Sequence, residues 1–281
     1  MNALQDKVAI VTGAAGSLGL ASVRALLAAG ARVMLVDREA AALARACAEL
    51  DAGSERLATY AGDVAAADTA AGYVADTLAR WGRLDVMFAN AGINGQIAPI
   101  TEYPDAVFDQ VMAVNVRGCY LACKHAMAAM STGGSIILNA SVVGVTADPG
   151  ICAYATSKHA IIGLMRVAAK EGGPRGIRVN VLAPGPIANA FQADIERRLS
   201  GIVGEDATAL LDSKIPPRTA WHPARGRQRR GLSGQRRQQL HHRQRASRRW
   251  RHAHLGVVNA MARTTVRNPL CRRRERLYES G

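Results

Sequence analysis

A tyrosine and a lysine stand four residues apart in the segment Y-A-T-S-K, as Tyr154 and Lys158, and Ser141 precedes the tyrosine by thirteen residues. These side chains suit hydride transfer to a carbonyl without a metal, because the carbonyl oxygen gains negative charge and must receive a proton. A phenol, with an ordinary pKa of about 10, is a weak acid near neutrality. An ammonium group one helical turn away lies on the same helix face, and we expect it to lower that pKa. Ser141 would donate a hydrogen bond to the same substrate oxygen. The spacing predicts Tyr154 as a general acid and base, although a Y-x-x-x-K pair alone is common in helices.

Three glycines follow a short apolar run near the start of the chain. Residues Lys7–Thr12 are mostly apolar and β-branched, which predicts a buried parallel strand. Gly13, Gly16 and Gly19 come next, and a helical pattern continues over Leu20–Ala29. Glycines at such a turn let the backbone approach a diphosphate whose charge sits at the helix N-terminus. For this segment alone, the alternative is a strand–helix turn with incidental glycines.

The second predicted strand, Ala31–Asp37, ends in a carboxylate eighteen residues after the last of these glycines. A carboxylate at that point would accept hydrogen bonds from the ribose hydroxyls of a dinucleotide. Its charge would repel a 2′-phosphate, so the sequence favours NAD over NADP. The neighbouring Arg38 would reduce the preference for NAD, because a cation there would attract the 2′-phosphate of NADP.

These motifs together resemble the short-chain dehydrogenase/reductase family over residues from about Leu4 to Pro216. The family's T-G-x-x-x-G-x-G motif corresponds to Thr12–Gly19, with Ser17 where the family has its middle glycine. The resemblance implies an NAD(P)-dependent alcohol dehydrogenase or ketone reductase. It also implies a cofactor site composed of Gly13, Gly16, Ser17, Leu18, Gly19, Asp37, Asp63, Val64, Asn90, Tyr154, Lys158, Pro184 and Ile187.

Other family motifs assign roles to several of these positions. Asn90 opens an N-A-G motif, which in the family supports the sheet and lines the cofactor cleft. Asp63, followed by Val64, corresponds to the adenine-side aspartate. Asn115 corresponds to a fourth catalytic member, which would hold a water that links Lys158 to solvent.

A loop and a lid are also expected on the strength of this resemblance. Pro184–Ile187 matches the family's loop over the nicotinamide. The threonine that the family carries two residues later is Asn189 here, and residues 189–214 are the candidate lid.

The alternation of strand-like and helical patterns predicts one α/β domain over residues 1–216. Its core would be a Rossmann-like, doubly wound parallel sheet with helices on both faces. No apolar run approaches the ~20 residues of a membrane span, and the start of the chain lacks a secretory pattern, so we expect a cytoplasmic protein. Cys119 and Cys123 share a helix face and are expected to be buried thiols, with no metal site. The six strand-like runs are Lys7–Thr12, Ala31–Asp37, Arg56–Ala61, Leu84–Asn90, Gly134–Ser141 and Ile177–Leu182.

The segment 217–281 differs sharply in charge from the rest of the chain. It carries 18 arginines, no lysine and two glutamates, a net charge of +16, whereas residues 1–216 carry −2 of the total of +14. One interpretation is a basic, disordered arm that binds nucleic acid or an acidic membrane. The other is a non-native ending, because the family continues with a helix, a last strand and a V-D-G-G ending, none of which occurs here.

The genetic code favours the second interpretation. If each codon joins the last base of one true codon to the first two bases of the next, Gln235–Arg245 decodes as S-D-A-S-S-F-I-T-G-S-A. The following Ala246–His254 then decodes as P-R-V-D-G-G-M-R-T. The single tryptophan codon at Trp250 fits the Asp-Gly step of that ending. We therefore expect a frame-shifted C-terminus from about residue 217, and nucleic-acid binding through residues 217–281 is the alternative function.

The expected consequence is a sheet that lacks its last strand, with Ile177–Leu182 left as an edge. Homo-oligomers, which the family's last helix and strand commonly support, are in doubt for the same reason, and a catalytically impaired product is an alternative. The substrate is predicted to be a secondary alcohol or ketone, but sugar, cyclic, steroid-like and acyl-thioester substrates remain open. The residues expected to flank the carbonyl are mostly apolar: Ile93, Gln96, Ile97, Val142, Val143, Pro149 and Ile151.

Overall fold

The computed structural model describes residues 3–131, 133–187, 189–203, 206 and 208–209. The predictions about the arginine-rich segment 217–281, and about the candidate lid beyond residue 209, concern residues outside those described. Across the described ranges, no helix combines the length and the apolar character that crossing a membrane requires.

Six parallel strands form one sheet in the order β3-β2-β1-β4-β5-β6. This confirms the predicted doubly wound sheet, and each strand falls within one of the six predicted runs. All five residues of β1 are buried, as expected for a central strand covered on both faces. Among the described residues, β6 has β5 as its one strand neighbour. The strands are β1 (Val8–Thr12), β2 (Arg32–Asp37), β3 (Leu57–Ala61), β4 (Val86–Ala89), β5 (Gly134–Asn139) and β6 (Ile177–Leu182).

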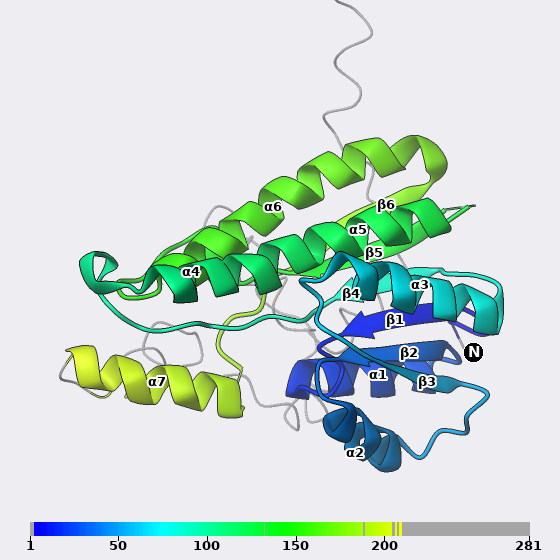
Figure 1. The fold of residues 1–281 in the computed structure, drawn as a ribbon, viewed down its shortest axis with the longest axis horizontal. Helices are drawn as coiled ribbons and strands as arrows, with labels where there is room; N and C mark the ends of the chain where they lie inside the picture. The colour runs from blue at the N-terminus through cyan, green and yellow to red at the C-terminus, as the bar shows by residue number, and fades with distance from the viewer. Residues whose placement is uncertain (1–2, 132, 188, 204–205, 207, 210–281) are drawn as a thin grey trace, which may run out of the picture.

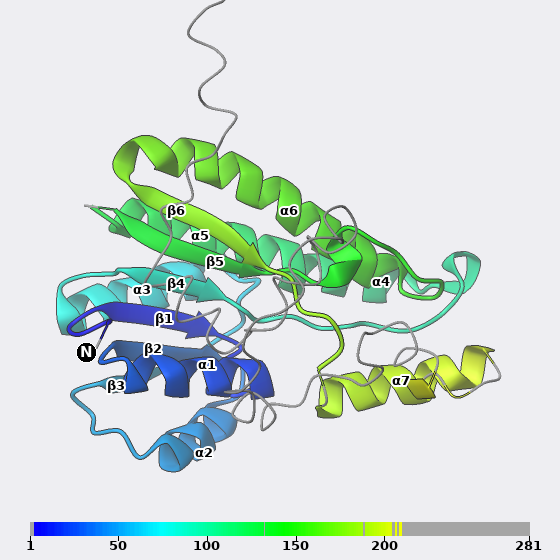
Figure 2. The ribbon, with the colours of Figure 1, turned by 180° about the vertical axis from the view of Figure 1, so that it is seen from behind.

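Helices cover both faces of the sheet (Figures 1 and 2). Met87 and Phe88, adjacent on β4, illustrate the two cores. Met87 packs with residues of α3, α5 and α6, whereas Phe88 packs with residues of α1 and α2, because successive strand side chains point to opposite faces. The helices are α1 (Ser17–Ala28), α2 (Ala40–Leu50), α3 (Ala67–Trp81), α4 (Asp105–Val111), α5 (Gly118–Ala129), α6 (Cys152–Gly172) and α7 (Ala190–Val203), with a π-helix, η2 (Met112–Arg117), and short 3-10 turns η1 (Ile100–Glu102), η3 (Val142–Gly144) and η4 (Gly173–Arg175).

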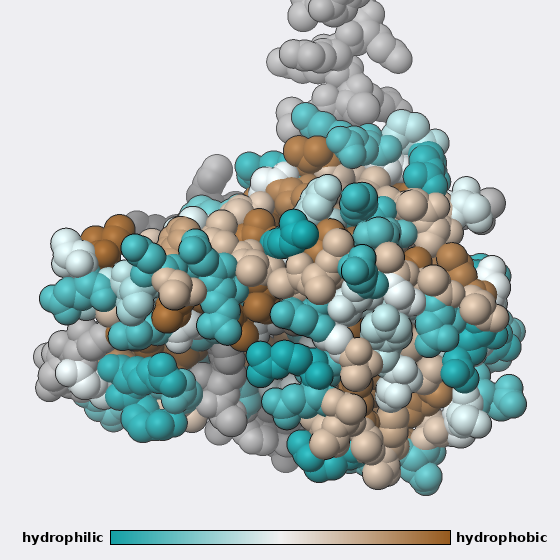
Figure 3. Space-filling model, in the orientation of Figure 1, coloured by the Kyte–Doolittle hydropathy of each residue, from teal (hydrophilic) through white to brown (hydrophobic). Residues whose placement is uncertain are grey.

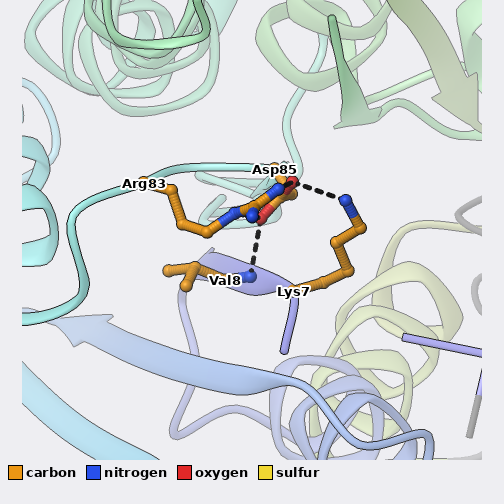
Figure 4. Close-up of polar contacts among 4 residues, drawn as sticks. All are labelled: Lys7, Val8, Arg83 and Asp85. Atoms are coloured by element: carbon orange, nitrogen blue, oxygen red, sulfur yellow. Dashed lines mark hydrogen bonds and ion pairs between the residues drawn. The ribbon is translucent and has the colours of Figure 1, made fainter. Parts of the chain in front are cut away.

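Asp85 joins the amino ends of the two central strands (Figure 4). Its carboxylate accepts hydrogen bonds from the Val8 N–H (3.0 Å), from Lys7 Nζ (3.0 Å) and from Arg83 Nε (2.8 Å). Burial opposes the charged form, but these donors hold the pKa of the Asp85 carboxyl below its usual range. Because the folded-state pKa is lowered, this stabilisation is present near neutral pH and is lost as pH falls through that pKa.

Parallel strands place all their carboxyl ends at one edge of the sheet, opposite Asp85. In Figures 1 and 2, β1 points toward the side of the molecule on which α7 lies. Ligands of open α/β sheets bind outside this carboxyl edge. The loops that leave β1, β4, β5 and β6 are therefore the place to look for a site.

Candidate active site

The turn between β1 and α1 is built to accept an anion. Gly13 has φ +61°, and a Cβ there would lie 2.8 Å from the Cα of Ala91. A Cβ on Gly19 would overlap the Gly13 carbonyl oxygen, so both positions require glycine. Helix α1 begins at Ser17, earlier than predicted, and its N-cap Gly16 offers no side chain to cap the first-turn N–H groups. Those N–H groups and the positive end of the helix dipole suit a diphosphate.

Asp37 is fixed beside this turn at the end of β2. One carboxylate oxygen accepts a hydrogen bond from the Ala15 N–H (2.9 Å) and the other from the Arg38 N–H (2.8 Å). The Arg38 side chain is exposed and lies 3.9 Å from Glu39. The carboxylate, rather than the arginine, therefore belongs to the turn.

Asp63 and Val64 follow β3 at the same edge. Asp63 is exposed, and its Oδ1 accepts a hydrogen bond from the Ala65 N–H (2.9 Å), which shapes the loop. Val64 is buried, and a Cβ on Gly118 would lie 3.1 Å from its Cγ2. The predicted adenine contact of these residues stays a prediction.

A lattice of hydrogen bonds joins the ends of β1, β4 and β5. Thr12 Oγ1 accepts from the N–H groups of Asn90 (3.0 Å) and Ala91 (3.1 Å). The Asn90 amide donates to the carbonyl oxygens of Thr12 (3.0 Å) and Gly13 (3.1 Å), and it accepts from Asn139 Nδ2 (3.1 Å). Asn90 thus bonds with residues at the ends of β1 and β5, and its predicted place in the cofactor cleft stays a prediction. The parts played by Thr12 and Asn139 were not predicted, because the sequence alone does not say which strand ends are neighbours.

Tyr154, Lys158 and Ser141 converge at the carboxyl end of β5. Lys158 Nζ lies 5.2 Å from the centroid of the Tyr154 ring. Lys158 is 2% exposed, and its amino group donates to the carbonyl oxygen of Asn139 (2.7 Å). Ser141 is buried and shares a side-chain hydrogen bond with Tyr154. The structure thus brings together the three side chains that the spacing singled out.

The electrostatics of the pair differ from the prediction. Burial raises the pKa of the Tyr154 phenol, and the hydrogen bond with Ser141 offsets this only in part. The predicted lowering by Lys158 is therefore wrong for the net direction, because desolvation of the phenolate outweighs its neighbours. Burial also lowers the pKa of the Lys158 ammonium to about 8. Lys158 is still mostly charged at neutral pH.

The lowered pKa of Lys158 predicts a pH-dependent contribution to stability. Between the ordinary pKa of 10.5 and the folded value of about 8, the unfolded chain binds a proton that the folded chain does not. The free energy of unfolding should therefore fall as pH drops from 10.5 to 8, and this component should vanish in Lys158→Met. Urea unfolding at several pH values gives the free energy of unfolding of the unmodified protein and of Lys158→Met. If the difference between these two free energies stays constant from pH 8 to pH 10.5, the lowered pKa of Lys158 is contradicted.

Asn115 forms hydrogen bonds with the backbone of the loop that follows β4. It is fully buried in the π-helix η2 (Met112–Arg117), a geometry often found at functional sites. Its Oδ1 accepts from the Ile93 N–H (2.8 Å), and its Nδ2 donates to the Ile93 carbonyl (2.9 Å) and to Ser157 Oγ (3.0 Å). Ser157 in turn donates to the Tyr154 carbonyl (2.7 Å). The Asn115 side chain thus ties the loop to α6, and its predicted water stays a prediction.

The loop after β6 borders Ser141. The Val142 N–H donates to the Pro184 carbonyl oxygen (2.9 Å), and Ser141 Oγ lies 3.4 Å from the same oxygen. This places the beginning of the Pro184–Ile187 loop beside the proposed acid and base. Its contact with a nicotinamide, through Pro184 or Ile187, stays a prediction.

A group of apolar side chains packs around Tyr154 and extends onto α7. An apolar molecule would be compatible with contact to these side chains. We call this group the apolar cluster; its members are Ile97, Val142, Val143, Ile151, Ala155, Ile195 and Leu199.

The apolar cluster contains part of the predicted substrate surface and three residues that were not predicted, Ala155, Ile195 and Leu199. Gln96 and Pro149 are exposed, and Ile93 is held by Asn115, while the other predicted residues join the cluster. Ile195 and Leu199 were missed. Their spacing of four residues marks a helix face, but only the fold shows that this face packs against the same cluster as Tyr154.

Cys119 and Cys123 are buried, as predicted. Burial raises the pKa of the Cys119 thiol to about 11 and that of Cys123 to about 12. Such thiols remain protonated and unreactive at neutral pH. Within the described residues, no group of three or more His, Cys, Asp or Glu side chains is arranged to hold a metal ion.

The comparisons with known proteins agree with this geometry. A family model described as short chain dehydrogenase matches residues 7–199. The chain belongs to the short-chain dehydrogenase family. As predicted, it is an oxidoreductase of the NAD(P)-dependent type that acts on alcohols or ketones.

Individual short-chain dehydrogenases resemble most of the chain. An A-factor type gamma-butyrolactone 1'-reductase (1S-forming) of Streptomyces virginiae is 36% identical over 221 residues, covering 77% of this chain and 84% of the relative. A 2,5-dichloro-2,5-cyclohexadiene-1,4-diol dehydrogenase of Sphingobium indicum is 40% identical over 190 residues, covering 66% and 75%. The solved structure of an NAD+-bound xylitol dehydrogenase is similar with a TM-score of 0.74 and 31% identity, covering 78% of this chain and 88% of that chain.

Proposed function

We propose that this short-chain dehydrogenase uses NAD(H) to interconvert a neutral, largely apolar secondary alcohol and its ketone, with Tyr154 as general acid and base. The observation that carries the proposal is the convergence of Tyr154, Ser141 and Lys158 at the carboxyl edge, beside a glycine turn fit for a diphosphate.

The cofactor would lie along the carboxyl edge, where the residues present fit it. The first-turn N–H groups of α1 and the hydroxyl of Ser17 would bind the diphosphate. Asp37, fixed by its two backbone donors, would accept from the ribose hydroxyls of the adenosine. When bound, the nicotinamide accepts or supplies the hydride.

Tyr154, with Ser141 and Lys158 beside it, would transfer the proton. In alcohol oxidation, the hydroxyl proton of the substrate passes to the Tyr154 phenolate as the carbon loses hydride. Ser141, which already bonds with the Tyr154 side chain, is placed to hold the substrate oxygen. The charged Lys158 over the Tyr154 ring favours the phenolate that this step requires. In ketone reduction the same groups act in reverse.

The proposed substrate class rests on the apolar cluster. Tyr154 is itself packed against this cluster, so the part of the substrate next to the reacting carbon would contact aliphatic side chains. Two relatives are named for a butyrolactone and a cyclohexadiene diol, which supports a ring-bearing substrate. The named xylitol dehydrogenase supports NAD but an acyclic polyol.

A panel of ketones tests this proposal. Turnover would be followed by NADH absorbance with cyclohexanone derivatives, short sugars and keto acids, beside an NADH fluorescence titration. We expect NADH binding, and we expect higher kcat/KM for the apolar cyclic ketones than for the keto acids. Preference for a keto acid or a sugar would contradict the substrate class, and absence of NADH binding would contradict the function.

The choice of cofactor gives a prediction at Asp37. Asp37→Ala removes the charge that repels a 2′-phosphate, so the preference for NADH over NADPH should narrow by about tenfold, which corresponds to roughly 1.4 kcal/mol of repulsion. Fluorescence titrations with both cofactors measure the ratio of Kd values. Asp68→Ala, which removes an exposed carboxylate on α3, is the charge-matched control. Tighter NADPH binding by the unmodified protein would show that Arg38 governs instead.

A further inference from the structure

Helix α7 is attached to the rest of the molecule along one face. Ile195 and Leu199 are four residues apart and pack against the buried residues of the apolar cluster, against which Tyr154 also packs. Asp194 instead pairs within the helix, with Arg197 (3.2 Å) and Arg198 (2.9 Å). Figure 3 shows hydrophilic residues over the outward side of α7. The helix is thus amphipathic, with its apolar face on the cluster that also packs against the proposed acid and base.

The N-terminus of α7 is fastened to the N-terminus of α1 by a pair of side chains. Asn189 Nδ2 donates to Ser17 Oγ at 3.0 Å, although the two residues lie 172 positions apart in the chain. Asn189 also caps its own helix, because its Oδ1 accepts from the Gln192 N–H (2.9 Å) and its backbone carbonyl accepts from Ala193 N–H (3.0 Å). The Asn189 side chain therefore caps the N-terminus of α7 and also donates a hydrogen bond to the first residue of α1.

We propose that Asn189 and Ser17 form a positioning pair that holds α7 over the apolar cluster and so shapes the substrate site. Two points of attachment define the helix: the Asn189–Ser17 hydrogen bond at its beginning and the Ile195–Leu199 contacts further along. At about 1.5 Å per residue, Asn189 and Leu199 are roughly 15 Å apart along the helix. Attachment at both points fixes the tilt of α7 as well as its position.

This pair links the two halves of the proposed site. Ser17 lies in the turn that would bind the diphosphate, whereas Ile195 and Leu199 pack against the apolar cluster that would border the substrate. Here the sequence departs twice from the pattern that the family resemblance implies, with serine in place of a glycine and Asn189 in place of a threonine. The structure brings these two departures into contact. The claim about the substrate site rests on the proposed function, but the attachment of α7 does not.

Hydrogen–deuterium exchange of the full chain tests the attachment without any ligand. Ser17→Ala removes the hydroxyl alone. Asn189→Ser keeps a good N-cap for α7 but loses the amide that reaches Ser17. Each variant should speed exchange of the α7 amides by about 3- to 10-fold, as expected for loss of one hydrogen bond. The double variant should exchange no faster than the faster single variant, because both changes remove the same bond. Ser54→Ala, in the exposed loop before β3, is the matched control and should leave α7 unchanged.

Kinetics then test the consequence for the substrate. At saturating NADH, Asn189→Ser should raise the KM of an apolar ketone by more than it lowers kcat, because the chemistry at Tyr154 is untouched. Unchanged exchange in α7, or effects of the two substitutions that add, would overturn the positioning pair. A KM that does not rise would overturn its role in the substrate site. If NADH does not bind at all, the proposed function fails, while the exchange measurements still decide the attachment.

Discussion

Replacing Tyr154 with phenylalanine should lower turnover by about 10²–10⁴-fold while NADH still binds, because general acid–base catalysis contributes on this order. The phenol is the group that bonds with Ser141 and lies under the Lys158 ammonium, and the substitution removes only its oxygen. Single-turnover rates and an NADH fluorescence titration on the same samples measure the two effects.

Tyr120→Phe is the matched control for this experiment. Tyr120 is 46% exposed on α5, so loss of its hydroxyl should alter neither turnover nor binding. Thermal unfolding of both variants checks that the fold is retained. If Tyr154→Phe keeps more than about a tenth of the rate, the proposed role of the phenol is wrong.

The strands were predictable because a sheet covered on both faces leaves a simple trace in the sequence. Every residue of Val8–Thr12 is buried, and so are the four central residues of Arg32–Asp37. Uniform burial requires short apolar runs, and such runs are visible without a structure. Their ends were less certain: Leu84 and Asn90 lie just outside β4, because hydrogen bonding at a strand end depends on the neighbouring strand.

The central part of the site was predictable for a related reason. Tyr154 and Lys158 lie on one helix, where a spacing of four residues fixes their relative position. The hydrogen-bond partners of Asn115 required tertiary information. Asn115 lies in a π-helical stretch and its amide bonds with Ile93 and Ser157, contacts that no local pattern indicates.

The predicted lowering of the Tyr154 pKa was wrong because burial, too, depends on the tertiary structure. The sequence shows that a lysine is near, but it does not show how much water the fold removes from the phenol. Burial has the larger effect, and it acts on both groups, raising the pKa of Tyr154 and lowering that of Lys158. Ile195 and Leu199 were missed because their packing against the apolar cluster depends on where the fold places α7.

The change in charge at residue 217 bears on how the sheet ends at β6. Among the described residues β6 pairs only with β5, and Val181 and Ala183 pack against the core while remaining partly exposed. We propose that the segment encoded in the alternative frame, which includes the decoded run S-F-I-T-G, supplies the strand that pairs with the outer edge of β6.

Restoring the alternative frame after Pro216 should therefore produce a more soluble and more stable enzyme that forms oligomers. We expect the midpoint of thermal unfolding to rise by roughly 10 °C or more, since each kcal/mol shifts it by about 2–4 °C in a domain of this size and a paired strand contributes several. Circular dichroism melts, light scattering and ketone turnover would compare three proteins: the chain as given, the frame-restored chain and a chain ending at Pro216. The truncated chain separates the effect of residues 217–281 from the effect of the segment encoded in the alternative frame.

The nucleotide sequence at the codons for Pro216 and Pro217 tests the frame itself. Equal stability and equal turnover in the given and restored chains would show that residues 217–281 are native to this protein.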